Sequence, residues 1–167
     1  MPRLVIVLPL TPLSEGDSFP VKDWPLHVTV LPPFLTDVDP AVIAAAIAAI
    51  ASVHPTVTAV VGPKEMFGRR QDVPVRLVIP TESLSRLHAA LIDAVRPHGA
   101  SPDEPAFTGN EFRPHITIKN HAAIEEGTAF TLRQVALVDM APRAATRGRT
   151  VLATYALSSA VGNPLDG

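Results

Sequence analysis

The chain has 167 residues, 47% of them hydrophobic and 18% charged, which suits one domain with a substantial core and excludes a disordered protein. It contains no cysteine, which excludes disulfides, thiolate metal ligands and a cysteine nucleophile, and fits a reducing cytoplasm. With a formal net charge of −2, its surface does not attract long nucleic acid in general, so a small nucleotide or an RNA end is the better match.

The apolar runs are too short for export or membrane segments. Residues 4–8 form too short a run for a signal peptide and predict a first strand instead. Residues 41–51 reach only about half the length of a membrane span. We therefore expect a cytoplasmic protein that does not enter a membrane.

Two segments have the features of helices. Asp39 is placed to be an N-cap, and Pro40 follows it at a first helical position, before apolar residues at helical spacing up to residue 53. A second helix is expected to begin after Thr81, as its N-cap, and to end near Arg96.

About seven segments rich in β-branched residues predict strands. They are residues 4–8, 27–31, 56–61, 75–79, a strand around 115–118, strands near 130–139, and residues 150–158. Pro32 and Pro33 are expected to end the second strand, because proline cannot donate to a ladder. The segments expected to form loops are residues 17–25, 62–70 and 97–111.

One tetrapeptide, His-apolar-Thr-apolar, occurs twice, at residues 27–30 and 115–118. Successive side chains of a strand point to opposite faces, so His27 and Thr29 share a face, as do His115 and Thr117. One copy is ordinary in a strand. Two copies facing each other would surround a small anion with two imidazoles and two hydroxyls, which predicts a phosphodiester site.

The fold expected from these elements is an α+β fold, formed by a single domain spanning residues 1–167. The helices and strands fall into two loosely similar halves, which indicates pseudo-twofold symmetry. Such symmetry would bring the two histidine-bearing strands together in a central cleft.

Paired histidines suit acid–base chemistry on a phosphodiester, because the unperturbed pKa of histidine is about 6.5. One imidazole takes a proton from the nucleophile and the other protonates the departing oxygen, which predicts a bell-shaped pH profile. Threonine hydroxyls can donate to the non-bridging oxygens. Whether His27 or His115 is the base stays open.

The two tetrapeptides lie within longer segments, Pro-Leu-His-Val-Thr-Val-Leu-Pro-Pro-Phe at residues 25–34 and Phe-Arg-Pro-His-Ile-Thr at residues 112–117. Their pairing, context and spacing resemble the two-histidine (2H) phosphoesterase superfamily. Bacterial members of this superfamily are called 2′-5′ RNA ligase-like proteins and cyclic nucleotide phosphodiesterases. The resemblance implies two lobes of antiparallel sheet, helices on the outside and an active site in the groove between the lobes.

The resemblance also implies a function and four roles. Family members cleave 2′,3′-cyclic phosphates, ADP-ribose cyclic phosphate or 2′-5′ linkages without a metal or other cofactor. Carried over to this chain, His27 and His115 are the acid–base pair, and Thr29 and Thr117 hold the phosphate.

Further residues are candidates for binding the substrate. Lys119 follows Thr117 by two positions and shares its face, whereas the matching position after Thr29 is Leu31, so that half of the cleft is expected to be less cationic. Aromatic rings could stack a base and loop arginines could bind phosphate. The full set of substrate-binding candidates is Lys119, Phe34, Arg113, Arg143, Arg147 and Arg149, with Phe67, Phe112, Lys64, Arg69 and Arg70 considered beside them.

The function expected is therefore that of a metal-independent phosphodiesterase acting on a cyclic phosphate or an RNA end, with no stable protein partner. Two alternatives stay open: a 2′-5′ RNA ligase using the same site in reverse, and a nucleotide- or RNA-binding module without turnover. A zinc site built on His27 and His115 is disfavoured, because the sequence offers no obvious third ligand on a matching face.

Overall fold

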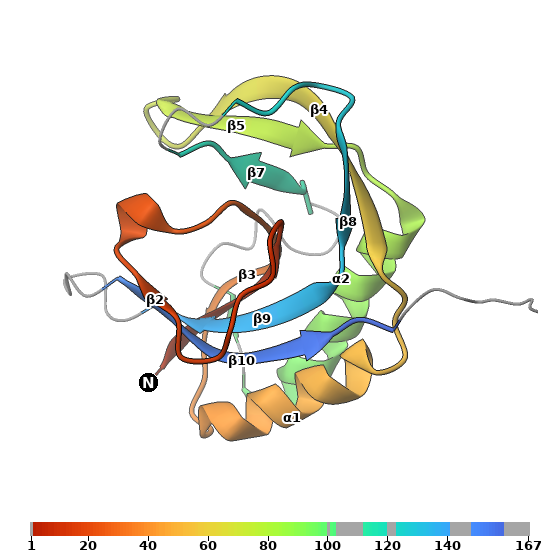
Figure 1. Cartoon of the computed structure of the whole chain (residues 1–167). Coiled ribbons are helices and arrows are strands. Elements are labelled where there is room, and N and C mark those ends of the chain that lie inside the picture. Colours follow the sequence, from red (N-terminus) through yellow and green to blue (C-terminus); the bar gives the residue numbers. More distant parts are fainter. Residues whose placement is uncertain (1, 100, 103–111, 120–122, 141–147, 159–167) are drawn as a thin grey trace, which may run out of the picture.

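The computed structural model describes residues 2–99, 101–102, 112–119, 123–140 and 148–158 (Figure 1). The strands are β1 (Arg3–Pro9), β2 (Ser18–Phe19), β3 (His27–Leu35), β4 (Val57–Phe67), β5 (Val73–Val78), β6 (Ser101–Pro102), β7 (His115–Thr117), β8 (Ala129–Leu132), β9 (Gln134–Asp139) and β10 (Arg149–Ala156). The helices are α1 (Pro40–Ala51) and α2 (Glu82–Val95), with short 3-10 helices η1 (Val21–Asp23) and η2 (Arg96–His98).

The strands form one antiparallel sheet in the order β2-β10-β9-β1-β3-β7-β5-β4-β8, with β6 paired to β3. The sheet curls, so that β5 and β7 in the upper half lie across from β9 and β10 in the lower half, and α1 and α2 lie outside it (Figure 1). The predicted α+β class, with antiparallel sheet and helices on the outside, is confirmed. The two histidine-bearing strands, β3 and β7, are neighbours at the centre.

Both predicted helices are confirmed, together with their caps. The side chain of Asp39 accepts a hydrogen bond from the N–H of Ala41 at 2.8 Å, and Thr81 accepts one from Leu84 at 3.2 Å. These bonds satisfy N–H groups that have no partner within a helix, which fixes where each helix begins.

The two faces of the first half of the sheet bury different cores. Leu4, Ile6 and Leu8 alternate along β1 and face the main core, which also contains the buried side chains of α1 and α2. Val5 and Val7 point the other way into a smaller core that includes Trp24. The segment between β1 and β3 therefore covers the inner face of this half (Figure 1).

The expectation that Pro32 and Pro33 end the second strand is wrong, because β3 continues to Leu35. Leu31 pairs with Ile6 and Phe34 with Leu4, so two prolines oppose one residue of β1 at a register shift. An irregularity of this kind tolerates residues that cannot donate to the ladder.

The other differences also lie at strand ends and loops. Residues 62–67 were expected in a loop but belong to β4, with a register shift between Val61 and Lys64. The short strands β2 and β6 fall in segments expected to be loops, and residues 129–139 form two strands separated at Arg133. No helix in the described part of the chain is long and apolar enough to cross a membrane.

Replacing Ile116 by alanine tests how strongly the central strand is held by the core. Its side chain is fully buried and pairs across to Val28, so we expect the free energy of unfolding to fall by about 2–5 kcal/mol, measured by urea denaturation. Ile116→Val is the matched control and should cost only about 0.5–1.5 kcal/mol. Equal stability of the alanine variant and wild type would mean that β7 does not depend on this contact.

Candidate active site

The pairing of β3 with β7 brings the two His-apolar-Thr motifs together. Val28 pairs with Ile116 in antiparallel register, and both side chains are buried in the main core. Continuing this register sets His27 opposite Thr117 and Thr29 opposite His115, all on the other face of the sheet. In a regular ladder diagonal neighbours such as His27 and His115 are about 7–8 Å apart.

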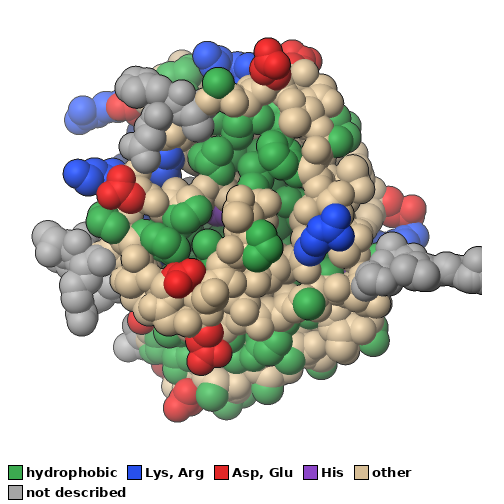
Figure 2. Space-filling model, in the orientation of Figure 1, with side chains coloured by type: hydrophobic (Ala, Val, Ile, Leu, Met, Phe, Trp, Pro, Cys, Tyr) green, Lys and Arg blue, Asp and Glu red, His purple; other side chains and the backbone are tan. Residues whose placement is uncertain are grey.

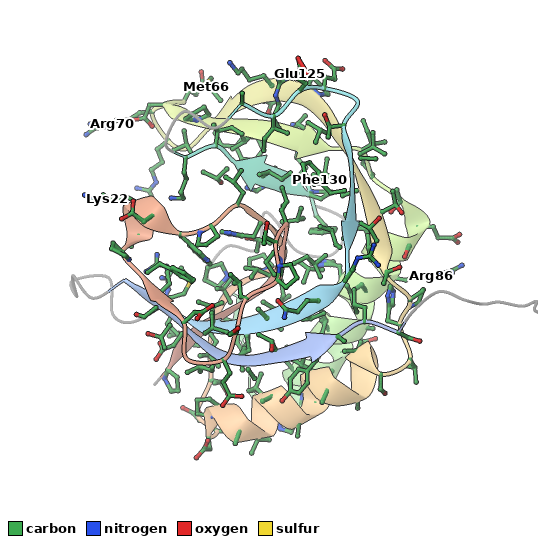
Figure 3. The ribbon with its side chains drawn as sticks, in the orientation of Figure 1. Lys22, Met66, Arg70, Arg86, Glu125 and Phe130 are labelled. Atoms are coloured by element: carbon green, nitrogen blue, oxygen red, sulfur yellow. The ribbon has the colours of Figure 1, made fainter. Side chains whose placement is uncertain are left out.

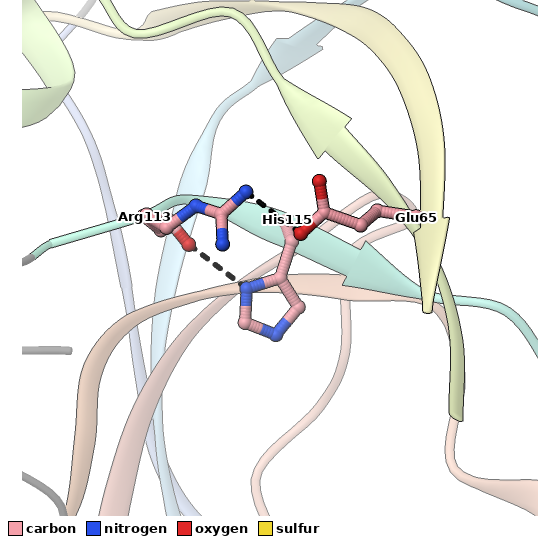
Figure 4. A network of polar contacts seen from close by, with 3 residues as sticks. All are labelled: Glu65, Arg113 and His115. Atoms are coloured by element: carbon pink, nitrogen blue, oxygen red, sulfur yellow. Dashed lines mark hydrogen bonds and ion pairs between the residues drawn. The ribbon is translucent and has the colours of Figure 1, made fainter. Parts of the chain in front are cut away.

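Both imidazoles are held in the same way by their own strands. Nδ1 of His27 donates to the carbonyl of Pro25 at 2.8 Å. Nδ1 of His115 donates to the carbonyl of Arg113 at 2.9 Å, as Figure 4 shows. A carbonyl oxygen only accepts, so Nδ1 carries the proton and Nε2 carries the lone pair of the neutral ring. The two strands thus present chemically equivalent nitrogens to the shared face.

Each histidine also lies against an aromatic ring. The rings of Trp24 and His27 are 4.1 Å apart, and the Arg149 guanidinium lies 5.3 Å from the Trp24 ring. On the other strand, Phe67 meets His115 edge-on at 4.6 Å, with the Arg113 guanidinium 5.0 Å from the Phe67 ring. These contacts restrict the orientation of each imidazole and bring an arginine near each half of the site.

His27 is held in its neutral form. Its side chain is 9% exposed, and burial lowers its pKa to about 4, partly offset by the hydrogen bond to Pro25. The charges of Lys119, His115 and Arg149 lower the pKa of His27 further. The surroundings of His27 are therefore cationic, and an anion bound there would raise its pKa again.

Lys119, just after β7, and Arg149, at the start of β10, supply positive charge near His27. Burial and the charge of Arg149 lower the pKa of Lys119, and burial together with the charge of Arg3 lowers that of Arg149. Arg149 donates one hydrogen bond to the carbonyl of Met140 at 2.9 Å, and its buried Nε has no partner among the described atoms. Both cations would be stabilised by a bound phosphate.

A cavity of about 530 Å³ opens beside Thr29 and His115. Phe67 and Phe112 line it, together with Arg113. Its size falls within the range of about 300–1,000 Å³ typical of small-molecule sites. In Figure 2 only a small patch of histidine surface is visible, between the upper and lower parts of this face.

The sequence candidates fall into three groups. Lys119, Arg149 and Arg113 lie near the two histidines, as described above. The expectation for Phe34 is wrong: its side chain is 0% exposed in the main core, so it cannot stack a base, whereas Phe67 and Phe112 line the cavity. Arg143 and Arg147 lie outside the described residues.

The structure also changes two expectations about charge, one for Leu31 and one for the basic residues of the loop after β4. Leu31 was compared with Lys119 by alternation, but the register shift after Thr29 turns Leu31 into the main core. The half of the cleft that contains His27 is not poor in cations, because the charges of Lys119 and Arg149 lower the pKa of His27. Of the loop cluster, Arg69 lines the cavity, and Arg70 points away from the protein at the β4–β5 turn (Figure 3).

Sequence reasoning missed Trp24, which packs on His27. The available signal was its position three residues before the histidine, as the only tryptophan of the chain, in a segment expected to be a loop. The described residues contain no group of three or more His, Asp or Glu side chains that could hold a metal ion.

Two His-x-Thr motifs on adjacent central strands of a curled antiparallel sheet define the class of two-histidine phosphoesterases. The family model of the 2′-5′ RNA ligase superfamily matches residues 9–144, and the chain belongs to this superfamily. A comparison with curated protein sequences finds no significant match.

Solved structures share the fold over nearly the whole chain. TT0787 of Thermus thermophilus is 18% identical with a TM-score of 0.62, covering 95% of this chain and 100% of that protein. Escherichia coli LigT complexed with 3′-AMP is 20% identical with a TM-score of 0.60, covering 95% and 99%. A further structure, of a phosphoesterase, is 20% identical with a TM-score of 0.61, covering 95% and 99%.

Trp24 provides a direct readout of His27, because it is the only tryptophan and its ring lies against the imidazole. A protonated imidazole quenches indole fluorescence, so we expect emission to fall with a midpoint near pH 4. His27→Gln should lose this transition. A midpoint near the ordinary value of 6.5 would contradict the burial of His27.

The same lowered pKa makes the fold less stable in acid. Unfolded His27 takes up a proton near pH 6.5 and folded His27 only near pH 4, so the free energy of unfolding decreases as pH falls through this window. The loss from this group approaches about 3 kcal/mol at the acid end. Urea denaturation at pH 7 and pH 4.5 should show a smaller drop for His27→Gln than for wild type, and equal drops would refute this linkage.

Proposed function

We propose that the protein hydrolyses a cyclic phosphodiester by acid–base catalysis with His27 and His115 and without a metal. The candidate substrates are nucleoside 2′,3′-cyclic phosphates, ADP-ribose cyclic phosphate and the cyclic phosphate end of an RNA. The observation that carries the proposal is the antiparallel pairing of Val28 with Ile116, whose register puts the two histidines and two threonines of the motifs on one face of neighbouring strands. Membership of the 2′-5′ RNA ligase superfamily supports it.

The burial of His27 supports its role as the base. A pKa of about 4 leaves its Nε2 unprotonated at neutral pH, ready to take the proton of an attacking water. As the water oxygen bonds to phosphorus, the bond from phosphorus to one ring oxygen breaks. The protonated His115 gives its proton to that oxygen, and the product is a phosphate monoester. Proton exchange with solvent restores both histidines.

The two threonines and the nearby cations stabilise the charge on phosphate. Thr29 and Thr117 can donate to the non-bridging oxygens, since each lies opposite a histidine on the shared face. Lys119 and Arg149 add positive charge next to His27. On the other side, the cavity lined by Phe67 and Phe112 has the apolar, aromatic character that suits a nucleobase. LigT has been crystallised with 3′-AMP, ATP and NADP+, ligands that combine phosphate with a base.

The test is hydrolysis of a panel of nucleoside 2′,3′-cyclic phosphates and ADP-ribose cyclic phosphate in EDTA, followed by phosphorus NMR. We expect turnover by wild type, with a loss of about 10²–10⁴-fold in kcat for either His27→Ala or His115→Ala. The position of the product phosphate identifies the bond that is cut. Activity that returns only with added zinc would exclude the metal-free mechanism, and no turnover by folded protein would favour an RNA substrate or a binding module.

The hydroxyl groups can be tested separately from the shape of the side chains. Thr29→Val and Thr117→Val keep the branched shape and remove one donor each, so we expect kcat to fall by about 10–10³-fold for each. Thermal unfolding monitors the fold, and Thr58→Val on the exposed face of β4 is the matched control. Full activity in both variants would rule out the proposed contact with phosphate.

A further inference from the structure

His88 lies in α2, outside the motifs, yet it contacts β3 and the segment that leads into β7. Its side chain is 3% exposed, and its Nδ1 donates to the carbonyl of Val30 at 2.7 Å. Its ring also stacks on Phe112 in parallel, with 4.0 Å between centroids and 3° between planes. The chemistry proposed above does not use this histidine.

The bond to Val30 falls at an irregular point of the catalytic strand. Thr29 pairs with Val7 and Leu31 with Ile6, so Val30 is the extra residue of a β-bulge directly after Thr29. A bulged residue is unpaired in the ladder and redirects its neighbours. The His88 imidazole therefore supplies a hydrogen-bond partner that the register of β1 does not.

The stack on Phe112 connects the same imidazole to the substrate cavity. Phe112 lines the cavity and directly precedes Arg113, whose carbonyl accepts the hydrogen bond from His115. The Phe112 ring is thus supported by His88 and also lines the cavity. One side chain of α2 holds both the bulge of β3 and the cavity wall that leads into β7.

We propose that His88 is a positioning residue that fixes Thr29 through the Val30 carbonyl and fixes a base-binding wall through Phe112. The inference rests on the proposed phosphodiesterase function and adds how the substrate's base is held. The hydrogen bond acts on the reaction at phosphorus, and the ring stack acts on the recognition of the base. These two contributions can be separated by substitution.

Two variants each keep one of these contacts. His88→Asn retains a donor near the position of Nδ1 and removes the ring, whereas His88→Phe retains the ring and removes the donor. Two substrates separate the effects: adenosine 2′,3′-cyclic phosphate, and glycerol 1,2-cyclic phosphate, which has the cyclic phosphate without a base. The measured quantity is kcat/KM for the adenosine substrate divided by kcat/KM for the glycerol substrate. This ratio does not depend on the fraction of folded enzyme.

We expect His88→Asn to lower this ratio about tenfold, through a higher KM for the adenosine substrate, since a base–aromatic stack is weakened. We expect His88→Phe to keep the ratio within about twofold of wild type and to lower kcat for both substrates about tenfold, because Thr29 is displaced. Ile43→Ala, a buried change in α1, is the control for general loss of packing and should leave the ratio unchanged. Equal effects of both His88 variants on both substrates, or no effect, would overturn the proposal.

Calorimetric titration with adenosine 2′-monophosphate and with inorganic phosphate distinguishes this proposal from the catalytic one. If wild type turns over neither cyclic substrate, hydrolysis of small cyclic phosphates is excluded as the function, but the affinity ratio of these two ligands still tests His88. A roughly tenfold weaker binding of the nucleotide by His88→Asn, with phosphate binding within about twofold, supports the positioning role. An unchanged ratio overturns it.

Discussion

The antiparallel pairing of Val28 with Ile116 is the constraint on which the candidate site depends. Both side chains are anchored in the main core, so the histidines and threonines on either side of them must share the opposite face. Because side chains alternate with a period of two, a slip of one residue would bury the polar groups and expose the apolar ones. The core therefore fixes the register of the site at the same time as it stabilises the sheet.

The two halves of the site are alike in their motifs and different in their surroundings. His27 is covered by Trp24, and its burial, followed by the charges of Lys119, His115 and Arg149, lowers its pKa. His115 borders a cavity with aromatic walls. In the proposed reaction the two ends have different roles. The cationic end binds the phosphate, and the aromatic end binds the group attached to it. Two copies of one motif thus provide an oriented site.

The sequence was sufficient for features that follow from local patterns, and insufficient where the sheet is irregular. The caps at Asp39 and Thr81 and the alternation within each motif follow local rules, and the structure agrees with them. The bulge at Val30 breaks the alternation that placed Leu31 in the cleft. A bulge is defined by the pairing with the partner strand, so a local sequence pattern does not predict it.

Aromatic side chains were the second source of error, for a related reason. Phe34, Phe67 and Phe112 are equally apolar, yet Phe34 lies in the core while the other two line the cavity. Trp24 is brought to His27 by the path of the segment between β1 and β3, which has little regular structure. Stacking contacts between such segments are tertiary and cannot be inferred from spacing.

The order of strands has a consequence for how the protein is made. The half of the sheet that carries His27 includes β1 and β3 from the start of the chain, but β1 also pairs with β9, and β9 with β10. During synthesis this half must wait for residues up to 156, while its early strands expose their unpaired edges. Contacts between such distant residues also slow folding. Formation of the site is thus a late event, and catalytic competence would report on completion of the whole sheet.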